Sequence, residues 1–156
     1  MGKIRFSSSK SFAPLLKKWG TESFKIYHNS SSTEPKFISW KGKDDVVKTT
    51  VHDKNSSVLI IGNVRLPEDK KTFLSFNVGC AEDSDWELEI IIEEGLYYRS
   101  VMKEKINART TINGWKEIEY DLSKYDGTEI EILIKQSADE IHKSSAYWNN
   151  LKIVSE

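Results

Sequence analysis

The feature that most constrains this sequence is a period-two alternation of apolar and charged residues in its second half. In residues 86–92, 117–122 and 129–135, every second side chain is apolar, and most of those between are Glu, Asp or Lys. Successive side chains of a β-strand point to opposite faces of its sheet. Each segment therefore predicts a strand with one apolar and one charged face, which is typical of an antiparallel sheet that packs on one side and is solvated on the other.

Turn residues divide the rest of the chain into similar short segments. The expected strands are residues 24–28, 36–40, 46–51, 57–61, 72–78, 86–92, 96–102, 115–121, 129–135 and 147–154. Many short strands without β–α–β alternation predict an all-β fold, a two-sheet antiparallel β-sandwich. One short helix is expected before them, with Ser11 as its N-cap and Gly20 as its stop. Leu15, Leu16 and Trp19 share one face of this helix.

Length and composition limit what the chain can do. Its 156 residues suit one domain, so we expect a single sandwich over residues 1–156, with residues 1–10 a flexible or cloning-derived start. A net charge of −1 disfavours nucleic acid as the main partner. The apolar runs are far shorter than the roughly 18 residues of a membrane span. The lone cysteine, Cys80, excludes an intrachain disulfide and is expected to be a half-buried thiol.

Two stretches in the second half carry a family resemblance. Residues 114–127, GWKEIEYDLSKYDG, resemble the "GW…DLS.YAG" stretch of the galactose-binding-like jelly-roll family, whose domains accompany glycoside hydrolases, sulfatases and polysaccharide lyases. Residues 146–153, AYWNNLKI, are similar to that family's terminal "A.WDN..I". Residues 64–67, 74–79 and 85–88 resemble its middle strands, so the resemblance covers roughly residues 46–154. It implies a jelly-roll sandwich in which Trp115 and Trp148 are framework residues.

The resemblance also implies a function. Domains of this family are accessory modules of polysaccharide-degrading enzymes, so we expect a non-catalytic, monomeric module that binds an oligo- or polysaccharide. Its expected partners are a glycan and an attached catalytic domain. Its expected place is extracellular, on the cell surface or in the periplasm. The alternative is a structural or protein-interaction sandwich that binds no sugar, which would show an apolar surface patch instead of an aromatic and polar cleft.

Sugar recognition requires an exposed aromatic ring for the C–H face of a pyranose and polar groups for its hydroxyls. Three places in the sequence offer such a ring. Tyr97, Tyr98 and Arg99 follow a tight turn, where alternation sends one tyrosine outward if the other points inward. Trp40 precedes a polar loop, and Trp86 follows an acidic one. We predict these five residues as the ligand-binding candidates.

A structural calcium ion is a further expectation. Asp44 and Asp45 lie in a loop beside Gly42, and carboxylate oxygens suit a hard cation. Asn149 stands where the resembled family often has an Asp, which weakens any cation site near the terminal strand.

Signals of catalysis are nearly absent. The three histidines have no motif spacing, and no nucleophile elbow, phosphate loop or metalloprotease motif occurs. Adjacent carboxylates such as Glu93 and Glu94 do not give the opposed pair that a glycosidase needs. The sequence therefore predicts that the protein is not an enzyme.

Overall fold

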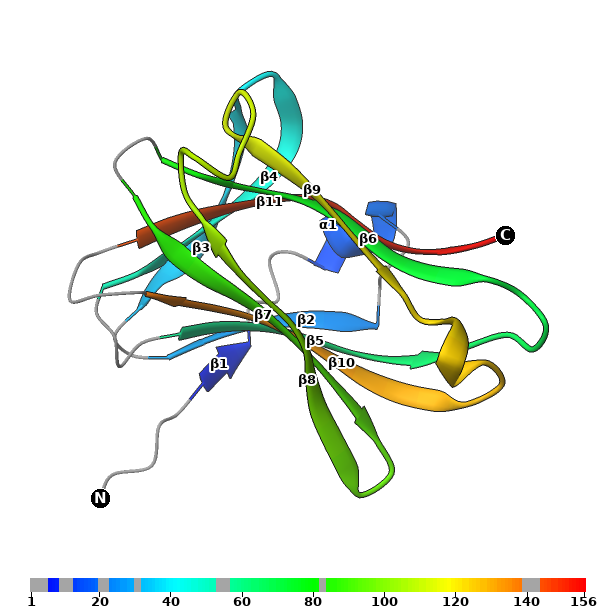
Figure 1. Ribbon diagram of the computed structural model, residues 1–156. Helices are drawn as coiled ribbons and strands as arrows, with labels where there is room; N and C mark the ends of the chain where they lie inside the picture. The colour runs from blue at the N-terminus through cyan, green and yellow to red at the C-terminus, as the bar shows by residue number, and fades with distance from the viewer. Residues whose placement is uncertain are drawn as a thin grey trace.

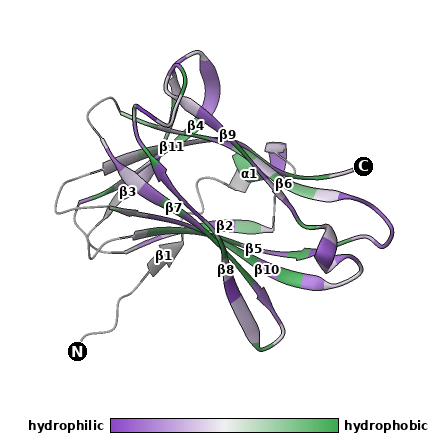
Figure 2. Ribbon diagram, in the orientation of Figure 1, coloured by the Kyte–Doolittle hydropathy of each residue, from purple (hydrophilic) through white to green (hydrophobic). Residues whose placement is uncertain are grey.

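The chain folds into two antiparallel β-sheets packed face to face, seen in the computed structural model of Figure 1. The structure describes residues 6–8, 13–19, 23–29, 32–52, 57–81, 84–138 and 144–156. Hydrophobic and hydrophilic residues alternate along many of the strands (Figure 2), so each sheet has an apolar face to bury. The predicted all-β sandwich of jelly-roll type is confirmed.

In the described part of the chain, one sheet has six strands and the other five. Sheet A has the order β1 (Phe6–Ser8), β2 (Phe24–Asn29), β5 (Ser57–Arg65), β10 (Glu129–Ala138), β7 (Trp86–Glu94) and β8 (Tyr97–Ile106). Sheet B has the order β3 (Ser32–Trp40), β4 (Lys43–Val51), β11 (Ser144–Ser155), β6 (Thr72–Cys80) and β9 (Trp115–Asp121). Every expected strand is present, most of them longer than predicted. β1 lies within the start that was expected to be flexible, and it pairs with β2.

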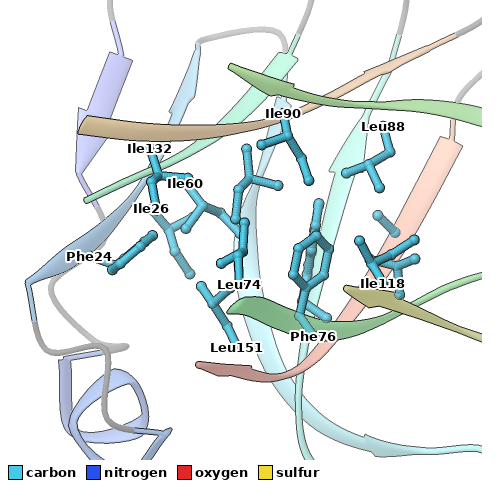
Figure 3. Close-up of a cluster of buried hydrophobic side chains, with 14 of the residues drawn as sticks. Phe24, Ile26, Ile60, Leu74, Phe76, Leu88, Ile90, Ile118, Ile132 and Leu151 are labelled. Carbon is cyan, nitrogen blue, oxygen red and sulfur yellow. The ribbon is translucent and has the colours of Figure 1, made fainter. Parts of the chain in front are cut away.

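The core fills the space between the sheets, as the alternation predicts. On β7 the side chains of Leu88, Ile90 and Ile92 are buried, while those of Glu87, Glu89 and Ile91 are only half-buried. Figure 3 shows Leu88 and Ile90 facing Phe76 and side chains of the opposite sheet. Burying one such side chain contributes about 1.5–3 kcal/mol, so this alternation is the main source of stability.

Trp86 and Trp148 form the aromatic centre of the core. Their ring centroids are 5.2 Å apart, and both side chains are almost fully buried. Trp86 Nε1 donates to the carbonyl of Gly79 at 3.2 Å, and Trp148 Nε1 donates to Thr49 Oγ1 at 2.8 Å. Thr49 in turn donates its hydroxyl proton to Gln136 of the other sheet. A buried polar chain thus connects the sheets without leaving these donors unpaired.

The predicted helix is present as α1 (Ala13–Trp19), and it lies near β11. Leu15 and Leu16 are buried in the core, and Trp19 packs partly against it. The expected cap and stop, Ser11 and Gly20, lie outside the described residues. No helix in the described ranges is both long and apolar enough to cross a membrane.

Most connections of the described strands cross from one sheet to the other. Two hairpins instead stay within a sheet: β3–β4 in sheet B and β7–β8 in sheet A. In Figure 1 they project from opposite sides of the sandwich. Their tips carry side chains that the core does not use, and both candidate sites lie there.

Candidate functional site

The β7–β8 hairpin carries the most exposed aromatic side chains of the described residues. Gly95 takes a φ of +61° at the turn, a conformation that glycine adopts without strain. The following residues are strongly exposed, with fractions of 97% for Leu96, 83% for Tyr97 and 76% for Tyr98. The turn therefore holds two tyrosine rings in solvent at the end of the sandwich.

A pocket of about 330 Å³ lies between this hairpin and the 3₁₀ turn η2 (Ser123–Tyr125). It is lined by Ile92, Glu94, Tyr97, Tyr98, Arg99, Lys124 and Tyr125. We call it the tyrosine pocket. Three of the five predicted ligand-binding residues, Tyr97, Tyr98 and Arg99, meet in it, whereas Trp40 and Trp86 do not take part.

Strand pairing explains how the hairpin presents these side chains. Arg99 lies opposite Ile92, whose side chain points into the core, and Tyr98 lies opposite Glu93. Tyr97 and Arg99 are therefore on the core side of sheet A, past the end of the core. Tyr98 is on the other side and still borders the pocket. The predicted alternation of the two tyrosines agrees with this register.

The opposite wall comes from η2. The backbone N–H of Ser123 donates to Asp121 Oδ1 at 2.8 Å, and the backbone N–H of Tyr125 donates to the carbonyl of Leu122 at 2.9 Å. Hydrogen bonds from the hydroxyl and then from the backbone N–H of Ser123 lower the pKa of Asp121. This turn fixes Tyr125 as a buried wall residue and places Lys124 Nζ 5.1 Å from its ring centroid.

The residues of this second wall were not predicted from the sequence. Tyr125 and Lys124 belong to a stretch identified as a turn, and nothing local indicates that the turn faces residues 94–99. The pocket combines three tyrosine rings with three charged groups, which suits a ligand with both an apolar face and polar substituents.

Trp40 forms a different aromatic cluster, on the outer face of sheet B. Its ring stacks on Tyr147 with centroids 3.7 Å apart and planes 4° apart, and it meets Trp115 edge to face at 5.2 Å. Trp115 Nε1 donates to the carbonyl of Lys41 at 3.0 Å. The β3–β4 turn thus bends across the sheet and touches β9 on the opposite edge.

Glycine makes this crossing possible. A Cβ on Gly79 would lie 2.8 Å from the Trp40 ring and 2.4 Å from the carbonyl oxygen of Gly114. Because Trp40 already has one ring face on Tyr147, it cannot offer that face to a ligand. Trp115, expected as framework, does hold this cluster together, although it lies half-exposed outside the core.

A second pocket of about 360 Å³ adjoins this cluster. It is lined by Lys41, Cys80, Ala108, Thr111, Asn113 and Gly114. No aromatic ring lines it, so it offers no stacking surface. Burial, with a smaller contribution from the charge of Asp85, raises the pKa of Cys80 to about 11, and the thiol is therefore not a nucleophile at neutral pH.

Trp86 is not a binding platform. The sequence analysis placed it beside an acidic loop, but its side chain is completely buried and its N–H is bonded to Gly79. It packs against Trp148 inside the core, so no ligand can reach its ring.

Asp44 and Asp45, the predicted calcium ligands, have protein partners in the structure. Asp44 Oδ1 accepts a hydrogen bond from Ser39 at 2.9 Å, and Asp45 is paired with the ammonium of Lys18. Asn149 Nδ2 donates to the carbonyl of Asp44 at 3.1 Å. These oxygens face donors, which is the wrong chemistry for Ca²⁺. Among the described residues, no group of three or more His, Cys, Asp or Glu side chains is placed to hold a metal ion.

The fold defines a class of protein by architecture. The solved structures that this chain resembles are largely carbohydrate-binding modules, and the chain has their β-sandwich fold. No protein-family model matches the sequence, and no curated protein matches it significantly.

Three of these structures show the extent of the likeness. A family 61 carbohydrate-binding module, solved with β-1,4-galactotriose, matches with a TM-score of 0.55 and 13% identity over 99% of this chain and 90% of that one. The family 11 module of the cellulosomal cellulase Lic26A-Cel5E of Clostridium thermocellum matches with a TM-score of 0.54 and 13% identity, over 99% of this chain and 97% of that one. The CBM22-1 xylan-binding domain of Paenibacillus barcinonensis Xyn10C matches with a TM-score of 0.55 and 12% identity, over 83% of this chain and 85% of that one.

Proposed function

We propose that this protein is a non-catalytic carbohydrate-binding module that holds an oligo- or polysaccharide in the tyrosine pocket. The observation that carries the proposal is the exposure of Tyr97 and Tyr98 beside the charged groups of one pocket. A pyranose presents C–H groups on one face, which pack on an aromatic ring, and hydroxyls at its edge, which need polar partners.

The comparisons support the class of ligand. Among the structures with this fold, one contains β-1,4-galactotriose and another is described as a xylan-binding domain. The small pocket engages only one or two sugar units, so we expect weak binding, with a Kd of about 10 μM to 1 mM.

The first experiment is affinity gel electrophoresis of the whole chain in gels that contain single polysaccharides. Tyr97→Ala and Tyr98→Ala should each weaken binding about 2- to 12-fold, the range for the loss of one aromatic contact. Ile112→Ala is the matched control, because Ile112 is also exposed but lies at the other end of β9. If no polysaccharide retards the protein and no chemical shift changes on titration, glycan binding is wrong.

A protein-interaction role is the second candidate, and Leu96 is the observation that favours it. Leu96 is 97% exposed and does not line the tyrosine pocket, so a sugar in the pocket leaves it uncovered. Leu96→Ser should leave glycan retardation unchanged if the pocket is the functional site. A sandwich that only contacts proteins would bind its partner more weakly after the same change and would never bind a glycan.

We further propose that the module acts outside the cell beside a catalytic domain. The family 11 module of similar fold is part of a cellulase, which supports this setting. Sequencing the gene on both sides of this segment tests it, because a flanking hydrolase, lyase or sulfatase domain is the expected result. A segment flanked only by domains without such chemistry would contradict it.

A further inference from the structure

The charges of the tyrosine pocket are unbalanced. Arg99 and Lys124 line it with a single carboxylate, Glu94. Among the described residues, no hydrogen bond or ion pair engages the guanidinium of Arg99, and Lys124 contacts only the Tyr125 ring. Lys103, farther along β8, is by contrast paired with Glu89 at 3.7 Å. The pocket therefore presents two cations that a ligand can neutralise.

The position of Arg99 suits a bound anion. Its side chain lines the same pocket as Tyr97, Lys124 and Tyr125, and the register puts it on the same face of sheet A as Tyr97. A guanidinium donates two parallel hydrogen bonds to a carboxylate or sulfate, and the Lys124 ammonium adds a compact charge. Three phenol rings around them supply a surface for the sugar ring itself.

The other side of the hairpin has the opposite charge. A smaller hollow of about 240 Å³ there is lined by Asn63, Glu93, Gly95, Glu129, Ile130 and Glu131. Its three carboxylates repel an anionic ligand, whereas the tyrosine pocket, with two cations to one carboxylate, attracts it. The hairpin thus separates a cationic from an acidic side, and Tyr98 stands between them.

We propose that the tyrosine pocket selects glycans that carry an anionic substituent, a carboxylate or a sulfate, with Arg99 as the group that recognises it. This inference rests on the proposed function, since it names the chemistry of the ligand for the same pocket. Glu94 does not oppose it, because a carboxylate beside the cations accepts hydrogen bonds from the sugar hydroxyls.

Matched pairs of polysaccharides test the inference on the intact chain. Polygalacturonate is compared with its fully methyl-esterified form, and a sulfated galactan with neutral agarose, by affinity electrophoresis and calorimetry. We expect at least about tenfold tighter binding to a charged member than to its neutral partner, and weaker binding in 500 mM than in 20 mM NaCl. Preference for polygalacturonate assigns the carboxylate, and preference for the sulfated galactan assigns the sulfate.

Single substitutions in the tyrosine pocket show which side chain causes the preference for charged polysaccharides. Arg99→Gln should abolish at least about nine-tenths of the affinity for the charged polymer and with it the preference over the neutral one, and Lys124→Gln should have a smaller effect in the same direction. Arg109→Gln is the control, since Arg109 is exposed and lies in the connection between β8 and β9, outside the pocket. The unaltered protein and the three variants should all give the same circular dichroism spectrum.

The outcomes separate this inference from the proposed function. Equal binding of the charged and neutral members, or an Arg99→Gln variant that still prefers the charged one, overturns the inference and leaves glycan binding intact. Failure to bind any of the four polymers overturns both together.

Discussion

At the scale of single residues, the tryptophans of the described strands have very different roles. Trp86 and Trp148 are buried with their N–H groups bonded, so each fills the core without leaving an unpaired donor. Trp40 and Trp115 cover the outer face of sheet B instead. The most exposed aromatic rings of the described residues are instead tyrosines, Tyr97 and Tyr98, whose hydroxyls tolerate water.

Asn149 allows a prediction about calcium. Its Nδ2 donates to the carbonyl of Asp44 at 3.1 Å, and its Oδ1 accepts from Asn77 at 3.1 Å. Asn149→Asp places a carboxylate against that carbonyl and should lower the free energy of unfolding by about 1–3 kcal/mol. Because oxygens then converge, millimolar Ca²⁺ should raise the Tm of this variant.

Asn149→Ala is its control, because it loses the amide without gaining a charge, and it should not respond to Ca²⁺. Thermal scans with Ca²⁺ or EDTA measure whether the Tm of each variant depends on the ion. A Tm of the unaltered protein that rises with Ca²⁺ would contradict our account of Asp44 and Asp45.

Cys80 gives a second prediction at this scale. Its pKa of about 11 leaves far less thiolate at pH 8 than an unperturbed cysteine, whose pKa is about 8.5. Iodoacetamide should therefore alkylate the native protein about two orders of magnitude more slowly than the urea-unfolded chain. Mass spectrometry over time measures both rates. Equal rates would mean that the thiol is open to solvent through the second pocket.

At the scale of elements, the pairing of β7 with β10 creates a local repulsion. Glu93 and Glu131 are register partners. Burial, and then the charge of Glu93, raise the pKa of Glu131. A carboxyl whose pKa is higher in the folded than in the unfolded state costs stability as the pH rises through the folded pKa. The pair is therefore least favourable at neutral pH.

Glu131→Gln should remove that cost. We expect the free energy of unfolding to increase by about 0.2–1 kcal/mol at pH 7, the range for charged cross-strand pairs, and the gain to vanish below about pH 4. Urea titrations between pH 3 and pH 8 measure it. Glu119→Gln, an exposed change on sheet B, should show no such pH dependence. A gain that persists at pH 3 would mean that charge is not the cause.

At the scale of the whole molecule, the two hairpins lie at opposite ends of the sandwich. β9 begins at Trp115, beside Trp40, and ends at Asp121, beside the tyrosine pocket. The sandwich therefore separates a closed aromatic cluster, which stabilises sheet B, from an open pocket, which is free to bind.

This separation predicts independent effects. Trp40→Ala should lower the free energy of unfolding by about 2–4 kcal/mol, because it empties the stack on Tyr147, and it should change glycan affinity less than about twofold. Tyr97→Ala should weaken glycan binding and leave the free energy of unfolding nearly unchanged. The double variant should show both effects, each of the size seen in the single variants. Denaturation and affinity electrophoresis of the three proteins test this. A strong effect of Trp40→Ala on binding would place the site at the other end.

The sequence by itself determined the elements and much of the pocket. Alternation of Leu88, Ile90 and Ile92 with glutamates predicts β7 and its buried face, because side-chain direction along a strand depends only on local backbone geometry. The turn at Gly95 and the alternation after it likewise predict that one of Tyr97 and Tyr98 points outward, whereas the structure exposes both. Both properties are encoded within a few residues of the chain.

Only the tertiary structure decided which strands are neighbours in each sheet and what meets the hairpins. Trp86 and Trp40 look alike in sequence, yet one lies under the opposite sheet and the other beneath its own bent hairpin. Lys124 and Tyr125 join the pocket because η2, which follows β9 of sheet B, lies against the β7–β8 hairpin of sheet A. Such contacts depend on strand order and sheet curvature, which arise from pairings between residues far apart in the chain and which no local pattern specifies.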